Sequence, residues 1–158
     1  MQGSLARLVN AMASARMGRE YLATYQRLIE TLIDCLIFIG GQLEEITVDM
    51  IIATLQKLSL KYVPRLQNKN NCVSIRFVIR KKMIEQGLIA WLVTDYLSKA
   101  EVKIYGLEYS TALLMNLCLH RSGKEQCVPI ATTVLEILVN LLIRDIKPVS
   151  NVNSMAKN

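Results

Sequence analysis

The stretch Leu107-Glu-Tyr-Ser-Thr-Ala-Leu-Leu-Met-Asn-Leu-Cys-Leu119 decides the fold of this 158-residue chain. Its apolar residues recur at helical spacing, and from Ala112 onward they cover most of the helix surface. A helix that is apolar nearly all round must be covered by neighbours on several sides. The stretch therefore predicts a core helix within an arrangement of layered helices.

Two earlier stretches repeat part of this pattern. Residues 53–60 align with residues 112–119 at a constant shift of 59, and residues 6–10 align with 112–116 at a shift of 106. Helix groups that recur at such spacing, each unable to bury its apolar face alone, are typical of an α-solenoid. The repetition therefore predicts that fold.

A second motif follows two of these stretches. Arg16-x-Gly18-x-Glu20 aligns with Arg121-x-Gly123-x-Glu125 at a shift of 105. We interpret both motifs as turns, in which the glycine lets the chain reverse after a helix.

Helical periodicity of apolar residues is visible in six segments. We expect helices over residues 4–14, 24–38, 47–60, 87–97, 105–119 and 129–143. They should end near Ser14, Ile39, Leu60, Leu97, Leu119 and Ile143, with strand content near zero. Trp91 and Tyr96 are expected to pack between repeats, because large aromatic side chains contribute most when buried.

Composition places the chain among globular proteins. Apolar residues make up 52% of it and charged residues 20%, whereas it has only 7 Gly and 3 Pro. This balance suits one domain with a sizeable core and excludes a disordered or low-complexity segment. The four cysteines are far apart, so we expect reduced thiols, with Cys35 and Cys118 in the core.

No targeting or membrane segment is expected. The first residues, Met1-Gln2-Gly3-Ser4, are polar and do not resemble a signal peptide. The longest apolar runs, residues 36–39 and 139–143, are far shorter than the roughly 18 residues that a membrane span requires.

The net charge of +6 is concentrated in one segment. Residues 61–82 hold seven basic residues and no acidic one: Lys61, Arg65, Lys69, Arg76, Arg80, Lys81 and Lys82. Such a segment could contact an acidic partner, RNA or a tubulin surface, although a run of this kind is more often a solvated loop. We expect residues 62–78 to be a surface excursion with at most a short local element, and residues 81–86 to form a short helix.

Motifs for enzyme chemistry are missing from the sequence. It has no Gly-x-Ser-x-Gly, no phosphate-binding glycine loop after a strand and no His-Glu-x-x-His. The single histidine, His120, offers with Cys118 and Cys127 at most three of the four ligands that zinc needs, so we interpret it as a helix-end residue. We expect no catalytic residues, no metal site and no cofactor.

The helix pattern resembles armadillo repeats. Residues 85–93 are similar to that family's second helix, and residues 108–117 to its third. Longer strings at residues 5–14, 53–60, 85–93 and 107–119 resemble the armadillo domain of the LisH-motif- and armadillo-repeat-containing proteins of cilia and basal bodies. The chain lacks that family's LisH motif and coiled coil, and the resemblance is lost over residues 61–82.

The resemblance implies a domain division as well as a fold. We expect about three armadillo repeats over residues 4–145, with residues 61–82 as a basic insertion. A third helix (4–14) would precede two repeats (16–60 and 61–119) and a partial one that starts at residue 121. Residues 146–158 would be a truncated repeat or a disordered tail, so the solenoid would be incomplete at its C-terminal end and the chain a fragment or truncated product.

A candidate binding surface also comes from the resemblance. In peptide-binding armadillo proteins the third-helix asparagine hydrogen-bonds the backbone of an extended ligand, and Asn10, Lys57 and Asn116 hold that place here. Ala6, Ala53 and Ala112 stand where the import receptors of that family carry tryptophan, so a groove of the import type is not expected. The alternative is that the asparagines bridge adjacent helices.

The leading functional interpretation is a protein-interaction scaffold. By resemblance, its partners would be ciliary or centrosomal proteins, and it would act in the cytoplasm and cytoskeleton, at the centriole, basal body or cilium, in cilium assembly. The alternatives are an armadillo adaptor of the adhesion or nuclear-transport type that binds an acidic peptide, and a nucleic-acid binder that uses residues 61–82. The sequence does not name the partner or the oligomeric state.

Overall fold

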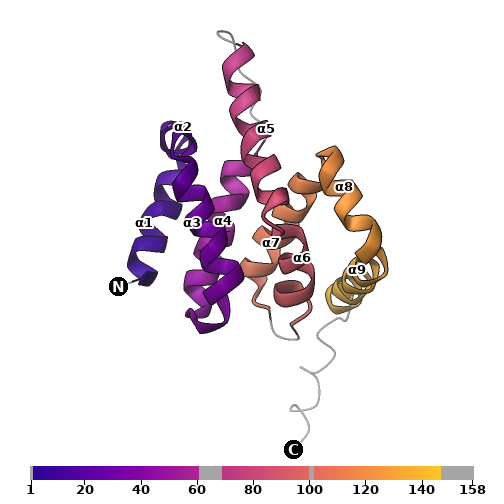
Figure 1. Ribbon diagram of the computed structural model, residues 1–158. Helices are drawn as coiled ribbons and strands as arrows, with labels where there is room; N and C mark the ends of the chain where they lie inside the picture. The colour runs from indigo at the N-terminus through magenta and orange to yellow at the C-terminus, as the bar shows by residue number, and fades with distance from the viewer. Residues whose placement is uncertain (1, 61–68, 100–101, 147–158) are drawn as a thin grey trace, which may run out of the picture.

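The computed structural model describes residues 2–60, 69–99 and 102–146. Within them all regular structure is helical, and none of it is strand (Figure 1). The all-α prediction is confirmed. In chain order the elements are α1 (Gln2–Ser14), α2 (Arg16–Thr24), α3 (Gln26–Ile39), η1 (Gly40–Gln42), α4 (Glu45–Ser59), α5 (Lys69–Glu85), α6 (Leu88–Trp91), η2 (Leu92–Leu97), α7 (Ile104–Cys118), α8 (Arg121–Cys127), η3 (Val128–Ile130) and α9 (Ala131–Ile146).

A three-helix unit recurs along this order. The helices α2, α3 and α4 form one unit, and α5, α6 with η2, and α7 form the next. The helix α1 corresponds to the third helix of a unit, and α8 and α9 to a first and a second. The units follow one another across Figure 1 from α1 on the left to α9 on the right, which is the form of an α-solenoid.

The third helices form the spine of this solenoid. The helix α4 packs along α1 on one side and along α7 on the other, and these are the two most extensive helix–helix contacts in the structure. Ten of its fifteen residues are buried, and Ile52, Ala53 and Leu55 are fully enclosed. The apolar pattern shared by residues 53–60 and 112–119 is therefore the pattern of helices that are covered on several sides.

Most predicted helix ends are confirmed. The helices end at Ser14, Ile39 and Leu97, as predicted, and at Ser59 and Cys118, one residue before the predicted positions. The last helix ends at Ile146, three residues after the predicted Ile143. Apolar periodicity finds these ends because each of these helices buries one face that extends close to its C-terminal end.

The two Arg-x-Gly-x-Glu motifs are helices, so their interpretation as turns was wrong. Gly18 lies within α2 and Gly123 within α8, and neither has a positive φ. A Cβ at Gly18 would overlap the carbonyl oxygen of Met12, and a Cβ at Gly123 that of Leu117. The glycines are required because the first helix of each unit lies against the last turn of the preceding third helix.

The expectation for the basic segment was also wrong in part. Residues 61–68 lie outside the described part, but α5 begins at Lys69 and runs to Glu85, so it replaces both the surface excursion and the short helix over 81–86. Ile79, Met83 and Ile84 are buried in the core. Burial of this one face stabilises a helix whose asparagines and β-branched residues have low helix propensity. Deletion of residues 62–78 would therefore remove half of α5.

The predicted helix over residues 87–97 is divided into two parts. Gly87 has φ = +80°, which ends α5, and the chain continues as α6 and then as the π-helix η2. The rings of Trp91 and Tyr96 stack with their centroids 5.7 Å apart, and both side chains are buried. Their predicted packing between repeats is confirmed.

The stretch from α8 to α9 is strongly apolar. Within Arg121–Ile143 an 18-residue window has a mean hydropathy of 1.8, so the stretch is, by length and composition alone, long enough to cross a membrane. Its charged first turns and the 3₁₀ turn at Pro129 interrupt that pattern, and Val134, Ile137 and Leu141 line a contact with η2 and α7. The absence of a membrane span stays a prediction.

The glycine contacts make a testable prediction. Gly123→Ala should lower the free energy of unfolding by at least about 2 kcal/mol, because the new methyl group forces α8 away from the last turn of α7. Urea unfolding followed by circular dichroism measures the effect. Gly41→Ala is the matched control, since a Cβ there meets nothing within 4 Å and the substitution should be neutral or stabilising by up to about 1 kcal/mol. Equal effects of the two substitutions would contradict the close approach.

Candidate functional site

The three residues singled out by sequence lie on the three spine helices. Asn10 is on α1, Lys57 on α4 and Asn116 on α7, and we refer to them together as the ladder. Their side chains do not simply line a groove: both asparagines are buried, with 9% and 6% of their surface exposed. Each one bonds to a neighbouring helix.

Asn10 and Lys57 are joined directly. The ammonium of Lys57 donates to Asn10 Oδ1 at 2.7 Å and to Ser14 Oγ at 2.9 Å. The amide of Asn10 in turn donates to Met50 Sδ at 3.2 Å and to the Tyr105 hydroxyl at 3.4 Å. One side chain of α1 therefore contacts both α4 and α7.

The surroundings of Lys57 disfavour its protonated form. Burial, and then the positive charge of Arg19, lower the pKa of Lys57 below its usual range. The ammonium also lies 5.5 Å from the ring centroid of Tyr109, which packs against Tyr105 at 4.6 Å. The ring of Tyr109 thus lies beside the ammonium, and this cation–π contact offsets part of the desolvation of Lys57.

Asn116 makes a separate clamp between α7 and α4. Its amide donates to Ser59 Oγ at 2.9 Å, and Ser59 Oγ donates to the Gln56 carbonyl at 2.6 Å within α4. Of the two interpretations left open by the sequence, the structure shows the bridging contact. A role of the ladder in partner binding is untested and stays a prediction.

A buried acid connects α4 to η2. The Tyr96 hydroxyl donates to Asp49 Oδ1 at 2.5 Å, and Asp49 is only 3% exposed. The pKa of the Asp49 carboxyl is raised, chiefly because the group is buried. The Tyr96 hydrogen bond and the charge of Lys103 oppose this shift, whereas the charge of Glu45 adds to it. Burial and the same bond raise the pKa of Tyr96. Gly106 of α7 is required here, because a Cβ would overlap the Tyr96 hydroxyl.

Three of the basic residues of this segment make contacts in the structure. Arg80 Nη1 donates to the Ser59 carbonyl at 3.0 Å and so caps the C-terminal end of α4. Lys81 pairs with Glu85 at 3.6 Å and Lys82 with Glu30 at 2.8 Å. Lys61 and Arg65 lie outside the described residues, and the side chains of Lys69 and Arg76, on the first half of α5, are not described. A binding role of these seven residues stays a prediction.

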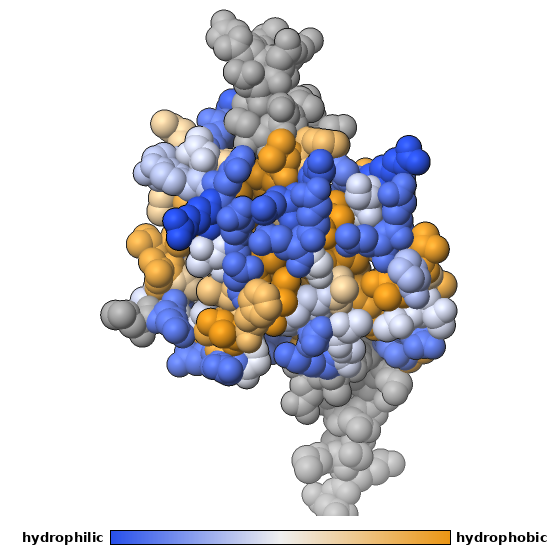
Figure 2. Space-filling view, in the orientation of Figure 1, coloured by the Kyte–Doolittle hydropathy of each residue, from blue (hydrophilic) through white to orange (hydrophobic). Residues whose placement is uncertain are grey.

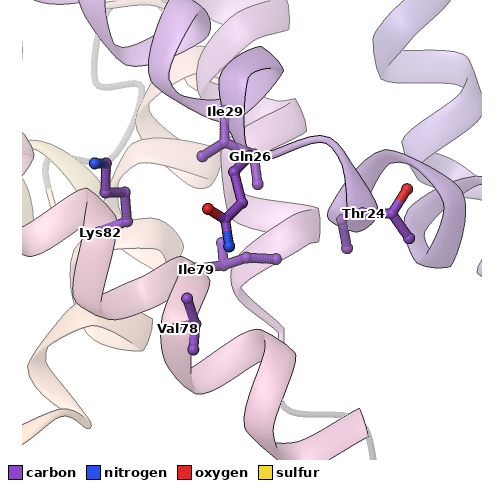
Figure 3. A pocket seen from close by; sticks show the side chains of 7 residues that line it. Thr24, Gln26, Ile29, Val78, Ile79 and Lys82 are labelled. Carbon is purple, nitrogen blue, oxygen red and sulfur yellow. The ribbon is translucent and has the colours of Figure 1, made fainter. Parts of the chain in front are cut away.

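An open groove lies between α3 and α5 (Figure 3). It encloses about 350 Å³, with Ile29 and Ile79 at its base, Val78 beside them and the Gln26 amide projecting between the two helices. The ammonium of Lys82 lies at the rim, where Glu30 neutralises it. In Figure 2 apolar residues reach the surface just below the grey atoms, within a belt of hydrophilic ones.

The described residues contain no cluster of three or more metal-ligating side chains. His120 precedes α8, and its Nδ1 accepts a hydrogen bond from the Ser122 amide at 3.2 Å, so the prediction of a helix-end histidine is confirmed. Its ring packs on Phe77 of α5 at 4.5 Å. These contacts attach the start of α8 to α5.

Several interacting residues were not predicted from the sequence. Ser59, Tyr105 and Tyr109 are common residue types in ordinary helical positions, and nothing in the pattern distinguishes them. Asp49 does carry a signal, since it is an acid inside the apolar run Val48-Asp49-Met50-Ile51-Ile52. A carboxylate at such a position needs a buried donor.

Comparison with known proteins identifies related armadillo-repeat proteins. Residues 83–154 match the family model described as the ARM repeats of LisH domain-containing protein ARMC9. The chain is 40% identical over 137 residues to LisH domain-containing protein ARMC9 of Danio rerio, and 38% identical over 143 residues to that of Homo sapiens. Each alignment covers 87% of this chain and 15% of the relative.

This chain carries armadillo repeats of the ARMC9 family. The armadillo assignment explains why a three-helix unit recurs and why its third helices form the spine. The chain spans about 15% of the length of these relatives. No solved structure matches the chain at a significant level.

The Asn116 clamp predicts a loss of stability. Asn116→Ala should lower the free energy of unfolding by roughly 1–3 kcal/mol, because it removes a buried hydrogen bond between α4 and α7. Chemical unfolding measures this. Asn140→Ala on the exposed surface of α9 is the matched control and should change stability by less than about 0.5 kcal/mol. An Asn116→Ala variant as stable as the parent would show that the clamp contributes nothing.

The Asp49–Tyr96 pair predicts a particular pH dependence. The pKa of Asp49 is higher in the folded chain than in the unfolded chain, so the folded chain keeps the Asp49 proton to a higher pH. The free energy of unfolding should therefore fall as the pH rises from the pKa of the unfolded chain to that of the folded chain. Asp49→Asn should remove this fall, so that the variant loses less stability than the parent between low pH and pH 7. Chemical unfolding at several values between pH 4 and pH 8 measures how the free energy of unfolding changes with pH. Glu136→Gln, at an exposed position of α9, is the control and should leave this dependence unchanged.

Tyr96→Phe makes the complementary prediction for the same pair. It leaves the buried carboxyl without its donor and should cost roughly 1.5–3 kcal/mol at pH 7. A Tyr96→Phe variant that unfolds like the parent at pH 7 would contradict the pairing.

Proposed function

We propose that this armadillo domain is a non-enzymatic protein-interaction scaffold in a centriole, basal-body or ciliary-tip assembly. Armadillo repeats of the ARMC9 family place it among protein-interaction repeat domains. The ciliary setting rests on the family resemblance of residues 5–14, 53–60, 85–93 and 107–119. On this proposal the chain works in the cytoplasm and cytoskeleton near the base of the cilium.

The observation that carries the scaffold proposal is the interlocked spine. Lys57 bonds α4 to α1, Asn10 bonds α1 to α7, and Asn116 bonds α7 to α4. Three helices from successive repeats are thereby held in one register, which gives an extended surface of fixed shape. A partner that binds such a surface loses little free energy to ordering it, and this suits a scaffold.

Exposed apolar side chains on the same helices support a protein partner. Ile104 and Met115 of α7 are 85% and 61% exposed, Leu119 directly after α7 is 64% exposed, and Leu5 and Leu8 of α1 are more than half exposed. Exposed apolar groups of this kind are typical of surfaces that contact other proteins.

Proximity labelling tests the proposal most directly. The chain fused to a biotin ligase in ciliated cells should label centriolar and basal-body proteins, and it should concentrate at the base of the cilium. The Gly123→Ala variant, whose repeat contact is broken, should lose that labelling, whereas Gly41→Ala should keep it. Labelling of junctional or nuclear-import proteins instead would favour the peptide-adaptor alternative and contradict the ciliary proposal.

The nucleic-acid alternative has a separate test. Residues 61–82 would have to supply free cations, yet Arg80 caps α4 and Lys82 pairs with Glu30. Fluorescence titration with a single-stranded oligonucleotide in 50 mM and 200 mM salt should show no specific binding. Tight binding that weakens steeply with salt, and that is lost on reversing the charges of Lys61 and Arg65, would overturn the scaffold proposal.

A further inference from the structure

Two cysteine thiols meet where α7 gives way to α8. Cys118 is the last residue of α7 and Cys127 the last residue of α8, and their sulfur atoms lie 3.4 Å apart. Both side chains are half-buried. The sequence contains four cysteines, far apart along the chain, and its spacing gave no sign that these two lie together.

The pair is specific to this junction and does not recur along the spine. By the internal alignment, the α1–α2 junction holds Met12 and Leu22 at the equivalent places, and the position of Cys118 in the middle repeat is Ser59. Two thiols facing each other are therefore not needed for the repeat to fold. They add chemistry that the other junctions lack.

We propose that Cys118 and Cys127 form a thiol–disulfide site that a hydroperoxide oxidises and a cellular thiol such as glutathione reduces. The sulfur atoms must approach by a little over 1 Å to reach the bond length of about 2.05 Å, and the two cysteines sit at helix ends, where such a shift costs least. The bond would tie the third helix of one repeat to the first helix of the next.

The short distance between the two sulfur atoms lets one thiol attack an oxidant while the other waits beside it. Burial, and then the hydrogen bond with the other sulfur, raise the pKa of Cys118 to about 12, which disfavours its thiolate. In the proposed sequence Cys127 attacks an oxygen atom of hydrogen peroxide as the thiolate. That step forms a sulfenic acid on Cys127 and, with one proton from solvent, releases water.

The second step closes the disulfide. The Cys118 sulfur attacks the sulfenic sulfur, the S–OH bond breaks, and the Cys118 proton leaves with the hydroxyl as a second water. In total two thiols and one hydrogen peroxide give one disulfide and two waters. Two glutathione molecules reverse the change, giving two thiols and one glutathione disulfide.

Cys127 is half-buried, so part of its side chain stays open to solvent, where a small, uncharged hydroperoxide can reach its sulfur. Cys118 lines an apolar cavity of about 200 Å³ between η2, α7 and α9, and Cys127 is not part of that lining. The cavity is therefore not the route by which the oxidant reaches Cys127.

Peptide mapping of the whole chain tests the site. The reduced protein is treated with a few equivalents of hydrogen peroxide, its remaining thiols are blocked with N-ethylmaleimide, and it is digested with trypsin. Because Arg121 and Lys124 lie between the cysteines, the expected product is peptide 104–121 linked to peptide 125–144, 2 Da lighter than the sum of the two reduced peptides. Dithiothreitol should release both peptides, and the thermal midpoint of the oxidised chain should lie about 5 °C higher.

Variants and denaturant supply the controls. The Cys35→Ser/Cys72→Ser double variant should keep the cross-link, and Cys118→Ser should abolish it. Oxidation in concentrated urea should give mixed pairings in place of the single link. If the native chain instead forms links through Cys35 or Cys72, or only sulfinic acid on a single cysteine, the proposal is overturned.

Discussion

The packing of α4 between α1 and α7 is the contact on which the rest of the structure depends. Most of α4 is buried, because α1 covers one side of it, α7 another, and the first and second helices of its repeat the remainder. No single helix of such a unit can bury its apolar face alone. The position of every other helix therefore follows from how these three are stacked.

Apolar packing alone would leave the register of the stack poorly defined. The buried polar contacts supply that definition, because each of them fixes α4 against a neighbouring helix at one relative position. Lys57 bonds to Asn10 of α1, Ser59 to Asn116 of α7, and Asp49 to Tyr96 of η2. A helix shifted by one turn would leave these groups buried and unpaired, which is costly. They act as clamps between repeats. This role explains why Asn10 and Asn116 are buried, although the equivalent asparagine of peptide-binding armadillo proteins contacts the ligand.

The fold could be predicted from sequence, because the recurring apolar pattern is a direct consequence of helix burial. Residues 53–60 and 112–119 identified the spine, and the helix ends at Ser14, Ile39 and Leu97 followed from periodicity. The prediction failed where tertiary contacts override local preference. At α5 a buried face that includes Ile79 and Met83 outweighs poor helix formers, and at Gly18 and Gly123 a glycine serves close approach and not a turn. The clamp partners Ser59 and Tyr105 could not be predicted, since contacts between distant residues leave no local pattern.

The account holds that stability is highest in the middle of the spine and falls toward the outer helices, where apolar residues of α1 and α9 remain exposed. Hydrogen–deuterium exchange of the intact chain, followed by mass spectrometry of peptides from α1, α4, α7 and α9, tests this claim most directly. The amides of α4 should exchange most slowly, at the rate set by global unfolding, and those of α9 much faster. Exchange of α4 as fast as that of α9 would contradict the central place given to the α1–α4–α7 stack.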